Sequence, residues 1–530
     1  MGHFVINGSY QMTACQVTEL PFKTLKNLPA FYRFYQYSPE DYPYFLSSTS
    51  CSEPIGPDIH QGDSNFDILF IRPEQRLILE QGQVLSFSDT SSSEKQTIDK
   101  QKGFLDNFNK IYQASACDKT SEFDFLPFRG GWFIFLSYEL AQEVEPVLKP
   151  IMSDYQVQQC LPRAYAARVR QALIIDHQKK RLFFITEQGI EHKAALQELQ
   201  KDIEQVQSEP EQPLQIEDLL LNLQEESEQL FLSSVERVRR YIRDGDVFQV
   251  NMSRLWQADI GSTETADSPE RTKSSEPANR HKHSDFAAFV YKKLSQSNPA
   301  PFSGLAGFKT ESGRASVISS SPERLLSVKN NRVESRPIAG THPRGSSDEE
   351  DKRLIERLHN HPKEQAEHIM LIDLIRNDLG RVCVPGTVQV DELMVNESYA
   401  HVHHIVSNVV GELQKDKTPV DVIKALFPGG TITGCPKIRC MEIIAELEQC
   451  SRGAYTGSMG YINRDGSMDL NILIRTFVLQ EQPAEDKAST VGQKLSFRAG
   501  AGLVFDSIAQ RELQETRAKA RGLLRALGLN

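Results

Sequence analysis

The stretch KEQAEHIMLIDLIRNDLGRV, from Lys363 to Val382, has the residue spacing of an amphipathic helix. Its apolar residues recur at helical intervals and form a stripe made of Met370, Leu371, Leu374 and Ile375. Glu367 and His368 come just before that stripe. The stretch therefore predicts a helix that holds one carboxylate and one imidazole near its start.

Two further polar clusters flank this helix in the sequence. The stretch SSPERLL, which precedes it, contains Glu323. The stretch ESYAHVHHIVSNVVGEL, which follows it, is strand-like and contains His401, His403 and His404. Because side chains alternate across a strand, His404 is expected on the opposite face from the other two histidines.

A last cluster lies in FDSIAQRELQETRAKARGLLRAL, which predicts a helix near the end of the sequence. Glu512 and Glu515 are three residues apart and so share one helix face. From the pattern alone, a solvated charged face is the more common explanation of this pair, since exposed acidic helices are common. Alternatively, glutamates on separate helices suit Mg²⁺, which prefers one or two carboxylates together with water and substrate oxygens.

The rest of the chain alternates strand and helix patterns. Short strands and two hairpins are expected before residue 190, and residues 191–229 are acidic and helical with a proline break. That break divides the chain into an N-terminal region, 1–210, and a C-terminal region, 230–530. Residues 259–284 are polar and predict a disordered insertion in which His281 and His283 are solvated.

The composition limits the possible partners and location. The formal net charge is −11 without a basic stripe, which argues against a nucleic-acid partner. The eight cysteines form no CxxC pair and no zinc spacing. No signal peptide and no apolar run of membrane-spanning length occurs. We therefore expect a cytoplasmic protein without a membrane partner.

Ten motifs together resemble the chorismate-utilising enzymes, and among them the large components of anthranilate synthase and aminodeoxychorismate synthase. They are FQVNMSR, SSPERLL, RPIAGTHPRG, AEHIMLIDLIRNDL, HVHHIVS, FPGGTITGCPKIRCMEII, RGAYTGSMGY, MDLNILIRT, RAGAGLVFDS and ELQETRAKA. The resemblance implies an α+β fold of two antiparallel β-sheets packed face to face, with helices outside. The N-terminal region would complete the sheets, and the C-terminal region would bind chorismate.

The resemblance also implies roles for particular residues. Glu367 and Glu515 resemble ligands of Mg²⁺, with Glu512 acting through water. Glu323 resembles an acid placed near the C4 hydroxyl of chorismate, which leaves more readily once protonated. His404 resembles the active-site histidine, and Thr341 is a further catalytic candidate. The groups implied to line the substrate are Ala339, Thr431, Tyr455, Arg475, Gly500 and Gly502. Arg475 suits a carboxylate, and the two glycines would let backbone N–H groups approach an anion.

Gln249 indicates the nucleophile. Family members that add water carry a lysine base at this position, and a glutamine amide cannot accept a proton at neutral pH. Ammonia is therefore the expected nucleophile. The sequence has no G-x-C-x-G nucleophile motif. A separate glutamine amidotransferase subunit is therefore the expected source of ammonia.

The choice between the two aminating branches depends on conflicting motifs. Many aminodeoxychorismate synthases have a nucleophilic lysine where this chain has Ala339, which favours anthranilate synthase. Lys437 is the first alternative nucleophile, and Arg336 and Arg344 could bias a lysine placed at 339 towards its neutral form. The stretches NPAPFSGLAGF, QVN and NILIRT favour aminodeoxychorismate synthase, as does Ser47 in place of the glutamate of a tryptophan-site motif.

These motifs predict an aminodeoxychorismate synthase component 1, a transferase on the path to para-aminobenzoate and folate. It would make 4-amino-4-deoxychorismate with Mg²⁺ and ammonia from the partner subunit. Anthranilate synthase component 1 is the alternative, and an inactive regulatory paralogue is a further one.

Overall fold

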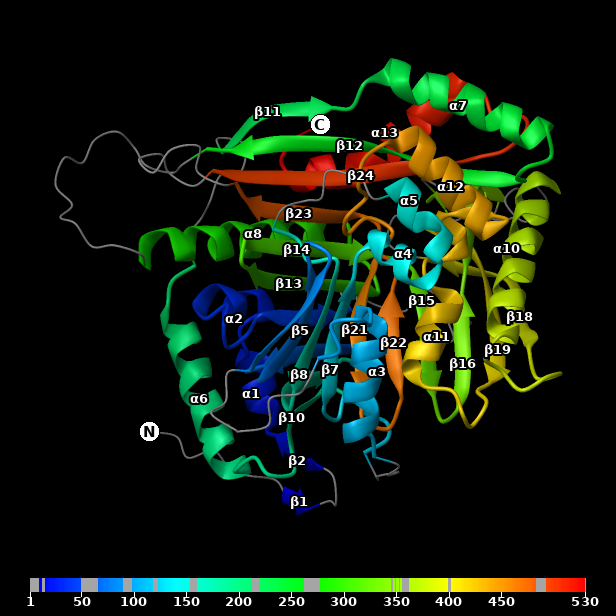
Figure 1. The fold of residues 1–530 in the computed structure, drawn as a ribbon. Coiled ribbons are helices and arrows are strands. Elements are labelled where there is room, and N and C mark those ends of the chain that lie inside the picture. The colour runs from blue at the N-terminus through cyan, green and yellow to red at the C-terminus, as the bar shows by residue number, and fades with distance from the viewer. Residues whose placement is uncertain are drawn as a thin grey trace.

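Two antiparallel β-sheets form the centre of the molecule, and helices cover their outer faces (Figure 1). This arrangement is seen in a computed structural model and confirms the predicted fold class. The model describes residues 9–11, 15–48, 65–88, 98–117, 123–152, 160–211, 219–261, 277–344, 347, 349–351, 353–354, 362–398, 402–482 and 492–529. No helix within these ranges is long and apolar enough to cross a membrane.

The larger sheet joins strands from both ends of the sequence. Its order is β1-β2-β10-β9-β4-β3-β13-β14-β23-β24-β12-β11, and β20 also pairs with β12. The bounds are β1 Ser9–Gln11, β2 Cys15–Leu20, β3 Tyr44–Ser47, β4 Phe66–Ile71, β9 Gln171–Asp176, β10 Arg181–Glu187, β11 Leu220–Glu225, β12 Gln249–Ile260, β13 Phe302–Thr310, β14 Gly313–Ser321, β20 Gly434–Cys435, β23 Thr476–Glu481 and β24 Gln493–Leu503. Within this sheet β3 pairs with β13, so the N-terminal strands continue the sheet built by the later ones.

The second sheet has the order β17-β19-β16-β15-β22-β21-β7-β8-β5-β6, with β18 paired to β19. Its bounds are β5 Gln75–Glu80, β6 Gln83–Ser88, β7 Gly131–Leu136, β8 Ala164–Val169, β15 Arg324–Lys329, β16 Arg332–Arg336, β17 Ile338–Pro343, β18 Gln389–Ser398, β19 Val402–Glu412, β21 Ser458–Asn463 and β22 Met468–Asn471. Every residue of β7 is buried, as its uninterrupted apolar sequence GWFIFL predicts for a strand covered on both faces.

Aromatic side chains fill the space between the sheets. The rings of Tyr44 in one sheet and Phe133 in the other stack with centroids 4.2 Å apart. The Tyr44 hydroxyl also lies 2.6 Å from the hydroxyl of Tyr165, which belongs to the second sheet. Because these contacts join β3 to β7 and β8, the two sheets share one continuous core.

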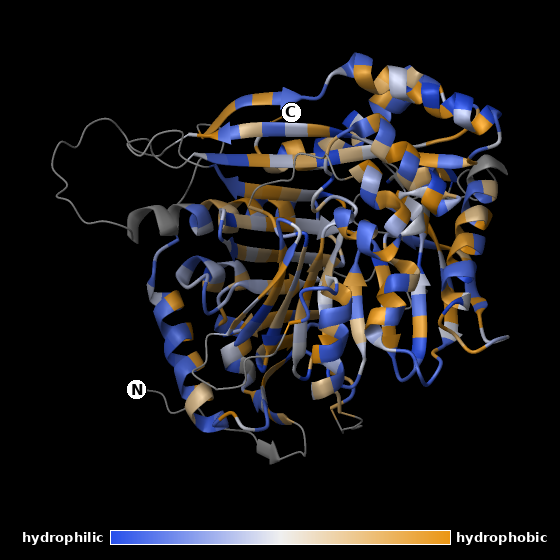
Figure 2. Ribbon diagram, in the orientation of Figure 1, coloured by the Kyte–Doolittle hydropathy of each residue, from blue (hydrophilic) through white to orange (hydrophobic). Residues whose placement is uncertain are grey.

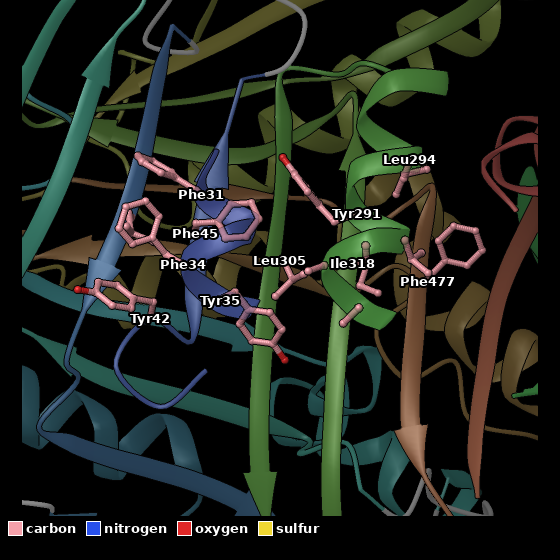
Figure 3. Packing of buried hydrophobic residues seen from close by; sticks show 14 of the residues in the cluster. Phe31, Phe34, Tyr35, Tyr42, Phe45, Tyr291, Leu294, Leu305, Ile318 and Phe477 are labelled. Carbon is pink, nitrogen blue, oxygen red and sulfur yellow. The ribbon is translucent and has the colours of Figure 1, made fainter. Parts of the chain in front are cut away.

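Helices bury apolar faces against the outer side of each sheet. Four pack on the larger sheet: α2 Phe31–Tyr37, α6 His192–Ser208, α8 Pro277–Ser297 and α13 Ala509–Ala526. Figure 3 shows Phe45, Tyr291 and Leu305 meeting where β3, α8 and β13 converge. Three pack on the second sheet: α3 Phe104–Ser115, α10 Pro362–Gly380 and α11 Pro419–Leu426.

A further core lies between α7 Glu228–Arg243, α12 Lys437–Glu448 and the ends of β12 and β24. Hydrophilic and hydrophobic residues alternate along α6 and α7, as in helices that bury one face (Figure 2). The short elements are α1 Phe22–Asn27, η1 Tyr138–Leu140, α4 Ala141–Val144, η2 Pro146–Leu148, α5 Lys149–Met152 and η3 Gly430–Ile432.

The predicted bounds of the disordered insertion, 259–284, are wrong at both ends. Asp259 and Ile260 belong to β12, and the chain is helical again from Pro277. His283 was expected in solvent but is buried, with its Nε2 atom 2.9 Å from the Ser316 hydroxyl. The polar composition was misleading because the start of α8 docks on β14. Residues 262–276 lie outside the described ranges, as does the side chain of His281.

Candidate active site

Glu323 lies in the turn between β14 and β15, where its side chain is only 5% exposed. Its atom Oε1 has no hydrogen-bond partner among the described residues. Burial raises the pKa of this carboxyl group to about 7, although the Thr431 hydroxyl, the Ile338 backbone and the charge of Lys519 act in the opposite direction. A small pocket is lined by both Glu323 and Thr431. The structure therefore brings these two candidate residues to one pocket, where burial favours the protonated form of the Glu323 carboxyl group.

His404 is held by the pairing of β17 with β19. Thr341 lies opposite His404, and the register shifts between Ala339 and Thr341, where Gly340 has a φ of 72°. Burial lowers the pKa of His404 to about 3, helped by the charge of Arg475 and opposed by a hydrogen bond to the Gly340 backbone. The imidazole is therefore neutral at pH 7. The side chains of Ala339 and Thr341 lie outside the described part of the chain.

His403 points to a different neighbour. Its Nε2 atom lies 3.0 Å from Oδ1 of Asp351, and the side chain is buried. The backbone and side chain of His401 lie outside the described residues.

Arg475 follows β22 and adopts the left-handed backbone conformation, with φ 51°. Its carbonyl accepts a hydrogen bond of 3.1 Å from the N–H of Ser320, and its Nη1 donates to Oδ1 of Asn298 at 3.3 Å. A non-glycine residue in this region is strained and persists where surrounding contacts hold it, often at functional sites. The strain and the effect on the His404 pKa both place Arg475 at the candidate site.

Gly500 and Gly502 make room for other side chains. A Cβ atom at Gly500 would lie 2.6 Å from the Tyr455 hydroxyl and 2.8 Å from Oδ1 of Asn251. A Cβ atom at Gly502 would lie 2.6 Å from Nε2 of Gln249. The glycines thus let three polar side chains approach β24. The anion contacts expected of their N–H groups stay a prediction.

Two of these neighbours have unused hydrogen-bonding capacity. Asn251 Oδ1 and Gln249 Oε1 are buried and have no hydrogen-bond partner within the described ranges. Buried polar atoms of this kind call for a ligand or water. Sequence reasoning used Gln249 and Asn251 only to choose between branches. Gln249 and Asn251 are two residues apart on a strand, so their side chains share one face. This spacing was the signal that both enter the site.

Tyr455 is positioned by a buried ionic network that sequence reasoning missed. Arg452 donates to Glu448 through Nε at 2.9 Å and through Nη2 at 2.7 Å. Its Nη2 also donates to the carbonyl of Asn251 at 2.7 Å, and its guanidinium lies 5.7 Å from the centre of the Tyr455 ring. Arg498 reaches the same carboxylate at 3.4 Å. The spacing of Glu448 and Arg452, four residues apart, was the available signal.

The predicted metal ligands lie on two helices. Glu367 is partly buried on α10, whereas Glu512 is buried on α13. Glu515 is 46% exposed and forms an ion pair of 2.8 Å with Lys519. In the part of the chain that the model describes, no three His, Cys, Asp or Glu side chains form a group that could hold a metal ion. Glu367, Glu512 and Glu515 therefore do not form a closed Mg²⁺ site made of protein groups alone.

Three cationic residues considered for amine chemistry are already paired. Lys437 Nζ lies 2.8 Å from Oδ2 of Asp378, in a buried ion pair. Arg336 pairs with Glu397 at 2.7 Å, and Arg344 is paired with an aspartate at 2.5 Å. Carboxylates compensate these charges. Lys437 is therefore not favoured as a nucleophile, and the two arginines are not favoured as groups that would keep a lysine at position 339 neutral.

Comparisons with known proteins identify the family of the chain. A family model described as chorismate binding enzyme matches residues 60–525. The chain is 41% identical over 403 residues to an anthranilate synthase component I-like protein of Synechocystis sp., covering 76% of this chain and 73% of that one. It is 38% identical over 415 residues to aminodeoxychorismate synthase component 1 of Bacillus subtilis, covering 77% and 79%.

Solved structures give the same result for the fold. Anthranilate synthase component I from Streptococcus pneumoniae has a TM-score of 0.61 and 31% identity, covering 89% of this chain and 94% of that one. The menaquinone-specific isochorismate synthase of Escherichia coli has a TM-score of 0.63 at 17% identity, covering 98% and 96%, and supports the fold alone. The chain belongs to the chorismate-binding enzyme family.

Proposed function

We propose that this protein is an aminodeoxychorismate synthase component 1, which replaces the C4 hydroxyl of chorismate with an amino group. The observation that carries the amination chemistry is the buried carboxyl group of Glu323, whose pKa is raised to about 7 by burial. The stretches NPAPFSGLAGF, QVN and NILIRT favour this branch over anthranilate synthase. The balanced reaction consumes chorismate and ammonia and releases water. Glu323 would donate its proton to the departing hydroxyl, and the proton lost by the incoming ammonia would restore it.

The other residues would bind and orient the substrate. Arg475 and the Tyr455 hydroxyl are suited to a carboxylate of chorismate. The amide oxygens of Asn251 and Gln249 are buried without partners within the described residues, and a hydrogen-bond donor of a bound ligand would satisfy them. His404 is neutral because burial lowers its pKa, so it would donate or accept a hydrogen bond without adding charge.

Mg²⁺ is part of the proposal. The donors available are carboxylates, a ligand type that this ion prefers, and it needs only one or two from the protein. Glu367 and Glu515 would hold it, with Glu512 in support. The ion would supply positive charge against a substrate carboxylate.

The ammonia would come from a separate glutamine amidotransferase subunit. Gln249 supports ammonia over water, because its amide lies against Gly502 where a water-adding enzyme would need a base. Lys437, the first alternative nucleophile, is held in a buried ion pair with Asp378, which does not favour a covalent step at that lysine.

Anthranilate synthase component 1 is the second candidate. Two observations favour it: Ala339 replaces the nucleophilic lysine of the other branch, and a protein named anthranilate synthase component 1 from Synechocystis sp. is 40% identical over 425 residues. Both enzymes would use the same binding residues. The two candidates therefore differ only in which carbon is aminated and whether pyruvate leaves.

Product identification separates the candidates. The purified chain would be incubated with chorismate, MgCl₂ and ammonium chloride, and the products separated and weighed by mass spectrometry. We expect a product that retains the enolpyruvyl group. Fluorescent anthranilate with an equal amount of pyruvate would instead establish the second candidate, and no product from intact chorismate would identify an inactive paralogue.

A further inference from the structure

A second cavity, of about 480 Å³, opens among the N-terminal elements. It is lined by the β5–β6 hairpin, the start of α3 and the segment from η1 to α5. None of its lining residues belongs to the candidate active site. Its volume falls within the roughly 300–1,000 Å³ typical of sites for small organic molecules.

The lining of this cavity is richer in cations than in available anions. Its basic residues are Lys100, Lys102, Lys149 and Arg163. The carboxylate of Glu143 already accepts from the N–H groups of Phe104 and Leu105, at 2.8 and 2.5 Å. The carboxylate of Glu139 accepts from the N–H groups of Arg452 and Gly453, at 2.7 and 3.1 Å. Backbone donors thus hold both acidic groups, and the four basic residues of the lining outnumber its two acidic ones.

Two donors in the lining also lack an acceptor. Nε of Arg163 and Nε2 of Gln142 are both buried and have no hydrogen-bond partner in the described part of the chain. Burying a donor without an acceptor destabilises the folded protein. Apolar lining is supplied by Leu79, Val84, Leu85 and Leu140. A ligand with a hydrogen-bond acceptor attached to an apolar body would fit both the two donors and the apolar side chains of this lining.

We propose that this cavity binds a small organic anion and that its occupancy alters chorismate binding. A carboxylate or phosphate group of the ligand would accept from Arg163 and Gln142, and its apolar body would lie against the leucines. No residue of the chorismate site takes part in holding this ligand.

Glu139 provides the link between the two sites. It lines the cavity, and its carboxylate fixes the two backbone N–H groups that begin the loop carrying Tyr455. The N–H of Tyr455 in turn donates to the carbonyl of Arg452 at 3.1 Å. Arg163 attracts the Glu139 carboxylate. An anion that binds Arg163 competes for that attraction and so changes how firmly Glu139 holds the loop.

The binding test uses calorimetry on the full chain in ammonia-free buffer saturated with chorismate and MgCl₂. The probes are phenyl phosphate, benzoate, inorganic phosphate and neutral benzamide. We expect binding of at least one aromatic anion and none of benzamide. Comparison of phenyl phosphate with benzoate assigns the head group, and inorganic phosphate measures the head group alone.

Variants then locate the binding. Arg163→Gln and, separately, Gln142→Leu should weaken the anion at least tenfold, with folding checked by circular dichroism. Lys110→Gln, an exposed change on the same helix α3 but outside the cavity lining, should have no effect. The proposed site would be overturned if none of the anions bound, if both cavity variants bound them as tightly as wild type, or if chorismate displaced them.

The link is tested by the affinity for chorismate with and without saturating aromatic anion. We expect at least a threefold shift in wild type and none in Arg163→Gln, and an unchanged affinity in wild type would overturn the coupling. The coupling part of the proposal rests on the proposed function, in which chorismate is the active-site ligand. The binding of an anion in the cavity does not rest on it. Absence of chorismate binding heat would therefore identify a failure of the proposed function rather than of the cavity.

Discussion

Glu323 combines a buried carboxyl group with a task that requires a proton. Burial raises its pKa to about 7, so the group is protonated below that pH and ionised above it. If it donates the proton to the C4 hydroxyl, kcat should fall by about tenfold per pH unit above the pKa. Initial rates at saturating chorismate between pH 6 and 9 measure this.

Glu323→Gln keeps the shape of the side chain but cannot donate an acidic proton. This variant should lose most of its activity and the fall above neutral pH. Glu236→Gln is the matched control, because Glu236 is a surface residue with a 53% exposed side chain paired to Arg239. An unchanged pH profile in Glu323→Gln would remove this residue from the acid role.

Glu367 and Glu515 allow a direct test of the metal. Glu367→Gln and Glu515→Gln should each abolish turnover at ordinary Mg²⁺ concentrations, because each removes one of the few carboxylates offered to the ion. Loss of the exposed ion pair between Glu515 and Lys519 should itself change stability by less than about 1 kcal/mol. Rates are measured against MgCl₂ concentration. Near-normal rates at low Mg²⁺ in both variants would contradict the assignment.

The identities of the candidate site residues were easier to predict from the sequence than the residues that they contact. Motifs identified Glu323, Thr431 and His404 as site candidates, and the model brings the first two to one pocket. They could not show that Asp67, from another strand, accepts a hydrogen bond of 2.9 Å from the Ser47 hydroxyl. Contacts between residues far apart in sequence depend on sheet order, which local patterns do not contain.

At the scale of elements, α12 ends in the ionic network that supports the Tyr455 loop. Glu448→Gln would leave Arg452 and Arg498 buried without a full counter-charge, which costs roughly 3–5 kcal/mol. We therefore expect a markedly lower melting temperature and a higher KM for chorismate. Calorimetry and steady-state kinetics measure the two effects.

The same helix offers a control. Glu446 pairs with Arg237 at the surface, and its side chain is 39% exposed. Glu446→Gln should change stability by no more than about 1 kcal/mol. Equal destabilisation by both substitutions would show that the buried network contributes nothing specific.

Predicted elements were most accurate where patterns were strong. The hairpins formed by β5–β6 and β9–β10 occur as expected. The start of α8 was missed because its residues are polar, and only docking on β14 makes that turn helical and buries His283. Tertiary contact there outweighs local composition.

At the scale of the whole molecule, this chain is expected to aminate chorismate, while a partner subunit releases ammonia from glutamine. The isolated chain should therefore use ammonium salts but not glutamine, since it lacks a nucleophile motif for glutaminase chemistry. Adding a glutamine amidotransferase subunit should confer glutamine dependence. Rates with each nitrogen source measure this, and glutaminase activity in the highly purified chain alone would refute it.

The pairing of β3 with β13 also has a consequence for how the chain is made. Ser47 pairs with Ser303, so the edge of β3 has no partner until the ribosome has added the intervening residues. At about 5–20 residues per second, that delay is roughly 13–50 s. An open strand edge is a template for aggregation. The nascent chain should therefore depend on chaperones, and an expressed fragment of residues 1–210 should accumulate in the insoluble fraction of a cell lysate while the whole chain stays in the supernatant.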